Sequence, residues 1–165
     1  EAVLAGRRGD LRTIAGNWEK SLSYRKSARN CYGAAAHALF SMKDPKLAEQ
    51  YLDALEYEVF YQNYLHNHSL RGRALAARQE YAPALAAFER EQRNYPESAI
   101  NWALRAEVLG KLGREAEKEQ ALTQLKLAME RKRLPLRALP LLFKNPEWDI
   151  NPRLFDRSLL GSGNE

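Results

Sequence analysis

Apolar side chains recur at intervals of three and four residues along most of the chain, which is the spacing of one face of an α-helix. The segment 81–98 is the clearest example, because Ala84 and Phe88 lie four residues apart within it. Ala48 and Leu52 form the same small-and-large pair earlier in the chain. Residues at this spacing share one helix face. The pattern therefore predicts an all-α fold without substantial sheet.

Capping residues indicate where several of these helices begin and end. Asp44 followed by Pro45 predicts a helix start, with the aspartate as N-cap and the proline in the first position. Ser98 is a second expected N-cap, and Gly113 is expected to end the helix that Ser98 begins. The segment 114–133 contains neither glycine nor proline, which predicts one long helix.

The small residues on the predicted helices recur at nearly constant offsets. Ala48 and Ala84 are 36 residues apart, and the same offset followed by one of 34 relates Ala36, Gly72 and Ala106. A small residue on one helix lets its neighbour approach closely, and a large residue one turn away fills the groove beside it. The offsets predict repeated helical hairpins that stack, since each hairpin exposes an apolar face that the next one covers.

This pattern resembles the tetratricopeptide repeat, a helix-turn-helix unit of about 34 residues. Three units in register cover about 104 of the 165 residues: 29–62, 65–98 and 99–132. The chain departs from the family pattern at Phe60, where proline is usual, at Arg71, where leucine is usual, and at Lys118, where alanine is usual. The resemblance implies a TPR-like α-solenoid of stacked helix-turn-helix units.

The two ends of the chain lie outside these units. Residues 1–28 are expected to form an N-terminal helix or a degenerate half-repeat. Four prolines between residues 134 and 165 exclude long helices there, yet the segment is rich in leucine. We therefore expect 133–157 to be an irregular, proline-rich cap over the open face of the last hairpin, followed by a disordered tail at 158–165. The whole is expected to be one domain, and we expect it to be a piece of a longer protein because it begins with Glu1.

Few residues in the sequence indicate a disulfide, a metal site or a catalytic site. The single cysteine, Cys31, excludes an internal disulfide and leaves the redox compartment open. His66 and His68 are two residues apart, which places them on different sides of a helix and disfavours a metal site. The sequence contains no Walker loop, no dinucleotide-binding glycine motif and no nucleophile elbow. We therefore expect no catalytic residues, no metal and no cofactor, and the protein is not expected to be an enzyme.

Charge and hydropathy narrow the possible partners without naming one. The chain has 26 Lys and Arg against 21 Asp and Glu, a formal net charge of +5, with basic residues gathered near both ends. A basic helical-repeat module that binds nucleic acid or another polyanion is therefore an alternative, although no known nucleic-acid motif accompanies the charge. The sequence shows no transmembrane segment and no leader pattern, and it leaves localisation and oligomeric state open.

The resemblance implies which residues contact a partner. In the family, the first helix of each unit lines a concave groove that binds peptides or helices of other proteins. The positions that carry over as groove candidates are Asn30, His37, Phe40, His66, Arg73, Glu107 and Lys111. We expect Arg73 and Lys111 to share one channel and to favour a partner peptide that carries a carboxylate. The family's specialised carboxylate clamp is not predicted, because Gly33 and His37 stand where it uses Lys and Asn.

The favoured hypothesis is thus a non-catalytic protein–protein interaction module, a scaffold that binds a peptide or helix of a partner. The polyanion-binding module is one alternative, and an accessory domain of a larger enzyme or assembly is another. Tyr57, Tyr61 and Tyr64 share a helix face. We expect this row to pack in the core between the first and second hairpins, and a peptide-binding ledge is the alternative because tyrosine suits half-exposed interfaces.

Overall fold

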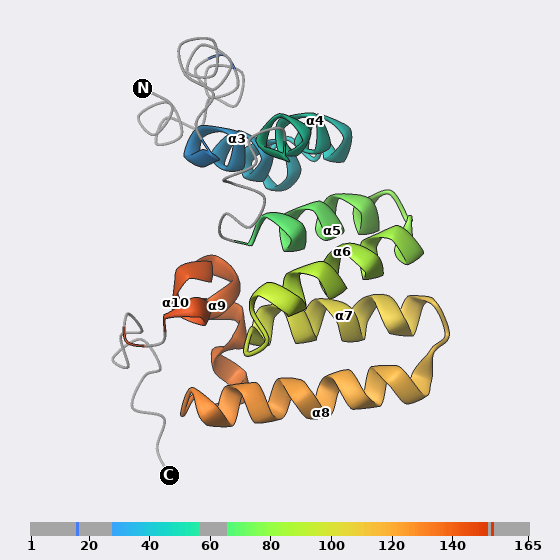
Figure 1. Cartoon of the computed structure of the whole chain (residues 1–165), viewed down its shortest axis with the longest axis vertical. Helices are drawn as coiled ribbons and strands as arrows, with labels where there is room; N and C mark the ends of the chain where they lie inside the picture. Colours follow the sequence, from blue (N-terminus) through green and yellow to red (C-terminus); the bar gives the residue numbers. More distant parts are fainter. Residues whose placement is uncertain (1–15, 17–27, 57–65, 152, 154–165) are drawn as a thin grey trace. The chain divides into compact units, whose positions relative to one another are not determined.

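The computed structural model describes residues 16, 28–56, 66–151 and 153 (Figure 1). These residues form helices and turns with no strand among them, so the predicted all-α class is confirmed for this part of the chain. The expected N-terminal helix, the tyrosine row and the expected tail lie outside the described residues. The chain divides into two compact units, Glu1–Ala87 and Phe88–Glu165, and each is described separately below.

The first unit is built from a helical hairpin and the helix that follows it. Helix α3, Ala28–Phe40, packs against α4, Pro45–Glu56, and both contact α5, Asn67–Ala77. The next helix is α6, Tyr81–Asn94, and the boundary between the units falls within it. The core shared by α3, α4 and α5 consists of small and aliphatic side chains: Cys31, Ala35, Ala38, Leu39, Ala48, Leu52, Leu55, Leu70 and Ala74.

The second unit is built around another hairpin. Helix α7, Ala99–Lys111, packs against α8, Glu115–Arg131. Three short elements follow: the 3₁₀ turn η2, Leu136–Ala138, then α9, Leu139–Lys144, and α10, Pro146–Ile150. Helices α9 and α10 both contact α7.

The expected N-caps are confirmed in atomic detail. The backbone amide of Leu47 donates to Oδ1 of Asp44 at 3.0 Å, which caps α4. The amide of Asn101 donates to Oγ of Ser98 at 3.0 Å, which caps α7. Each bond satisfies one of the amides that the first turn of a helix leaves without an intrahelical acceptor.

Three helices are followed by a residue with a left-handed backbone, and these residues recur at the offsets of the sequence repeat. Lys43 after α3, Gln79 after α5 and Gly113 after α7 all have a positive φ, of 59°, 64° and 70°. These positions are 36 and 34 residues apart, which are the offsets of the sequence repeat. Helices α4, α6 and α8 begin at residues 45, 81 and 115, again 36 and 34 apart. Only the third stop is a glycine, so Lys43 and Gln79 hold a left-handed conformation that disfavours side chains.

Small residues occupy the hairpin positions that the sequence repeat indicated. Ala48 and Ala84 are both fully buried. In the third hairpin the equivalent position is Lys118, and its aliphatic stem lies over Gly110. A Cβ added to Gly110 would come within 3.3 Å of Cδ of Lys118. The glycine on α7 thus makes room for a long side chain on α8, where the other hairpins use alanine on the second helix.

The C-terminal segment is irregular, as its prolines predicted. Leu134, Ala138 and Leu142 are at most 6% exposed, so it is a packed part of the second unit over the described residues. Its short helices α9 and α10 lie against α7, the first helix of the last hairpin. The polar contacts described below explain this position, because α10 supplies a carboxylate to the start of α7.

Candidate functional site

Two groove candidates from different helices meet in the first unit. Phe40 is the last residue of α3, and Arg73 lies in the middle of α5. The guanidinium carbon of Arg73 lies 4.2 Å from the centre of the Phe40 ring, which is a cation–π contact. Phe40 nevertheless remains 40% exposed, and Met42, just beyond α3, is 36% exposed. The end of α3 therefore presents an apolar surface beside a positive charge.

The other two groove candidates of α3 are less exposed than Phe40. Asn30 and His37 are both half-buried, and His37 lies one turn before Phe40. Nε2 of His37 is buried and has no hydrogen-bond partner among the described residues. Because this nitrogen is shielded from solvent, His37 adds to the shape of the helix surface and does not present Nε2 as an exposed polar atom.

His66 lies at a different kind of position. It precedes the first residue of α5 and is 3% exposed, as buried as its neighbours Asn67, His68 and Ser69. A side chain that is covered in this way offers no contact area to a partner. Phe40 is therefore the exposed candidate of the first unit, while Arg73, like Asn30 and His37, is half-buried.

Glu107 and Lys111 are the candidates of the second unit. Both are exposed, and they lie four residues apart on α7. Opposite charges at this spacing face each other on a helix surface. Arg73 belongs to the first unit and Lys111 to the second, so the expectation that they share one channel stays a prediction.

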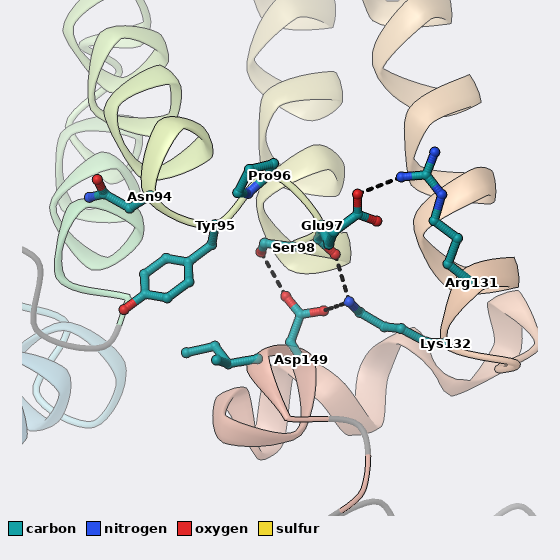
Figure 2. A pocket seen from close by; sticks show the side chains of 9 residues that line it. Asn94, Tyr95, Pro96, Glu97, Ser98, Arg131, Lys132 and Asp149 are labelled. Atoms are coloured by element: carbon teal, nitrogen blue, oxygen red, sulfur yellow. Dashed lines mark hydrogen bonds and ion pairs between the residues drawn. The ribbon is translucent and has the colours of Figure 1, made fainter.

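No sequence pattern pointed to Asp149 of α10, which accepts several hydrogen bonds in the second unit. Its carboxylate accepts a hydrogen bond from Oγ of Ser98 at 2.6 Å and from the amides of Ala99 at 3.0 Å and Ile100 at 3.2 Å (Figure 2). Nζ of Lys132 lies 3.6 Å from the same carboxylate. The Asp149 side chain is fully buried and that of Lys132 is 5% exposed. A carboxylate from the C-terminal segment thus caps α7 from outside.

The end of α8 joins this group through Glu97. Nζ of Lys132 donates to the backbone oxygen of Glu97 at 2.6 Å, and Arg131 forms an ion pair with the Glu97 carboxylate. That hydrogen-bonded pair raises the pKa of Arg131 above its ordinary value. Arg131 and Lys132 are therefore both paired with carboxylates within the unit.

A cavity of about 370 Å³ opens beside these residues. Its walls come from the end of α6, the start of α7, the end of α8 and α10, and Figure 2 shows Tyr95, Pro96 and Asp149 around it. Burial raises the pKa of the Tyr95 phenol and the Glu91 carboxylate raises it further, so this hydroxyl stays protonated. The lining combines apolar rings, a phenol and paired charges.

Several basic side chains of the described helices face carboxylates on a neighbouring element or turn. The pairs are Arg71 with Asp53, Arg78 with Glu49 and Glu80, Arg105 with Glu89, Arg114 with Glu117, and Lys118 with Glu115. Such pairing divides the positive charge into local dipoles.

The residue types that most often carry chemistry have defined places among the described residues. No group of three or more His, Cys, Asp and Glu side chains within them is placed to hold a metal ion. Cys31 is buried in the core of the first unit. Ser98 is bonded to Asp149 and to the Asn101 amide, so its hydroxyl serves the helix start. None of the described helices is long and apolar enough to cross a membrane.

Comparison with protein-family models finds none that matches this chain, and comparison with curated proteins finds no match.

Proposed function

We propose that the protein is a non-catalytic interaction module that binds a peptide or helix of a partner protein, as the repeat pattern suggests. The observation that carries the proposal is the contact between Phe40 and Arg73. It joins an exposed aromatic ring and a guanidinium from two helices that are distant in sequence. We call this surface, together with Met42, the α3–α5 face.

The chemistry of the α3–α5 face favours a particular kind of peptide. Aromatic and arginine side chains are enriched among the residues that contribute most to binding at protein interfaces. The ring offers apolar contact area and orients the guanidinium, which forms charge-assisted hydrogen bonds with carboxylates. The natural complement is a segment with an apolar side chain close to a carboxylate.

The polyanion alternative has less support from the described residues. Arg131 and Lys132, which belong to the basic group at the exit of α8, are paired with Glu97 and Asp149. The basic group near the N-terminus lies outside the described residues. The accessory-domain alternative is compatible with the proposal, because an interaction module can belong to a larger protein.

A peptide-display selection against the full chain tests the proposal. We expect the enriched peptides to combine an acidic residue with an apolar one, and their affinity can be measured by fluorescence polarisation. Arg73→Glu should weaken binding by about 10- to 100-fold, since a charge-assisted hydrogen bond contributes about 1.5–3 kcal/mol. Phe40→Ala should weaken it by about 10-fold, because it removes the ring that supports the charge.

Lys46→Glu is the matched control, because Lys46 is an exposed basic residue on α4. It changes the net charge as Arg73→Glu does and should leave peptide affinity unchanged. Equal losses in the two variants would show a non-specific charge effect and refute the α3–α5 face. Salt-dependent binding of generic oligonucleotides, without peptide enrichment, would favour the polyanion alternative.

A further inference from the structure

The repeat places an arginine opposite a carboxylate once in each unit. Arg71 of α5 faces Asp53 of α4, and Arg105 of α7 faces Glu89 of α6. The two carboxylates are 36 residues apart and the two arginines are 34 apart, which are the offsets of the sequence repeat. The two pairs therefore occupy equivalent positions.

The pair in the first unit is hydrogen-bonded and the pair in the second unit is not. Nη2 of Arg71 donates to Oδ1 of Asp53 at 2.9 Å, whereas Nη2 of Arg105 lies 3.8 Å from Oε1 of Glu89, beyond hydrogen-bond distance. Nε of Arg105 is buried, and it has no acceptor within the described part of the chain. Across those residues neither the Arg105 guanidinium nor the Glu89 carboxylate forms a hydrogen bond, although the two charges lie side by side.

Trp102 holds the guanidinium of Arg105 in place. The guanidinium carbon lies 4.7 Å from the centre of the Trp102 ring, which is a cation–π contact between residues three apart on α7. The ring is itself fixed, because its Nε1 donates to the backbone oxygen of Pro96 at 3.1 Å. Stacking fixes the plane of the guanidinium and leaves its N–H donors to bond within that plane.

The open pair is partly desolvated and yet can be reached from solvent. Burial lowers the pKa of the Arg105 guanidinium below its ordinary value, although the carboxylates of Glu89 and Glu117 oppose this shift. A guanidinium in such surroundings gains more from a hydrogen-bond acceptor than one in water. Arg105 is 19% exposed and Glu89 is 44% exposed, so a group from outside can contact both.

The open pair offers a donor and an acceptor to the same ligand group. A free carboxylate would bond to Arg105 but would be repelled by Glu89, and an ammonium would meet the opposite difficulty. An amide avoids both, because its oxygen accepts a hydrogen bond and its N–H donates one. Arg114 and Glu117 do not alter this balance, since they are bonded to each other by two hydrogen bonds of 2.6 Å.

We propose that Arg105 and Glu89 form an amide-binding site for a partner peptide, in which the amide oxygen accepts from Arg105 and the amide N–H donates to Glu89. The amide is a backbone peptide group or the side chain of Asn or Gln. The site rests on the proposed function, because it takes a peptide as its ligand, and it adds a second contact chemistry to that of the α3–α5 face.

The peptides enriched by display against the full chain are the probes, and fluorescence polarisation measures their affinity. Arg105→Lys keeps the charge but loses the planar fork, and it should weaken binding by about 10-fold. Glu89→Ala removes the acceptor and should weaken binding to a similar extent. Arg114→Lys is the matched control, because it makes the same change at an arginine already bonded to Glu117, and it should leave affinity unchanged.

NMR of the wild-type chain tests the site without any variant. The Nε–H resonance of Arg105 should shift when peptide is added, whereas that of Arg114 should not, and a purely structural arginine would not respond. Changes in the peptide identify the source of the amide. Loss of affinity on N-methylation of one peptide bond indicates a backbone group, and loss on replacing Asn or Gln by Ala indicates a side chain.

The outcomes separate this site from the α3–α5 face. An Arg105 resonance that does not shift, or equal effects of Arg105→Lys and Arg114→Lys, would overturn the amide site even if Arg73→Glu still weakens binding. Binding that is lost in Arg105→Lys and kept in Arg73→Glu would support the amide site and refute the α3–α5 face. A selection that enriches no peptide would overturn both.

Discussion

Replacing glycine with alanine is expected to change the stability of the protein in opposite directions at two positions near the end of α7. Gly110 lies within the helix, and Gly113 follows it with a φ of +70°. Alanine is favoured over glycine inside a helix by about 0.5–1 kcal/mol, because glycine loses more backbone freedom on folding. In the left-handed region the preference is reversed, and a Cβ costs about 1–2 kcal/mol.

The surroundings of Gly110 set the size of the first effect. The new Cβ would lie 3.3 Å from Cδ of Lys118, so the lysine stem must shift by a few tenths of an ångström. Lys118 is 34% exposed and able to move, although it then weakens its surface ion pair with Glu115. Since such pairs contribute about 0.3–0.5 kcal/mol, we expect Gly110→Ala to stabilise the protein by about 0.5 kcal/mol.

Gly113→Ala should destabilise the protein by about 1 kcal/mol, because nothing within 4 Å of the added Cβ compensates for the strain. Denaturant unfolding followed by circular dichroism measures both variants, and thermal midpoints should move by about 2–4 °C per kcal/mol. The pair Gly110→Ala with Lys118→Ala is the control, since it removes the close contact. Shifts of the same sign in the two single variants would refute the helix end described for α7.

Two further predictions concern packing. Ala84→Phe should destabilise the protein by about 1–3 kcal/mol, because Ala84 is fully buried. Ala86→Phe, at an exposed position of α6, should have little effect. Equal unfolding midpoints for the two variants would show that a small residue is not required at position 84. Truncation after Arg133 removes the buried Leu134, Ala138 and Leu142, so the shortened chain should aggregate or melt earlier than one truncated after Asn151, as light scattering and thermal melts can test. A soluble and equally stable chain ending at Arg133 would show that the C-terminal segment is not a cap.

Local sequence was sufficient to predict the helices and many of their ends. Asp44 and Ser98 cap helices as expected, because a cap is a contact between residues three apart. The repeat offsets of 36 and 34 reappear in the left-handed stops after α3, α5 and α7. Two of these left-handed residues, Lys43 and Gln79, are not glycines, so only their place in the repeat could have predicted their conformation.

Tertiary structure decided the contacts between residues that are distant in sequence. Asp149 lies 51 residues from Ser98, and no local pattern distinguishes it from other carboxylates of the C-terminal segment. The resemblance indicated Phe40 and Arg73 separately, and folding brought the ring and the guanidinium together. It also buried His66, which the same pattern had made a groove candidate. Helix periodicity arises from neighbours within a few residues, whereas partner choice and burial depend on which helices pack together, and that is a property of the folded chain.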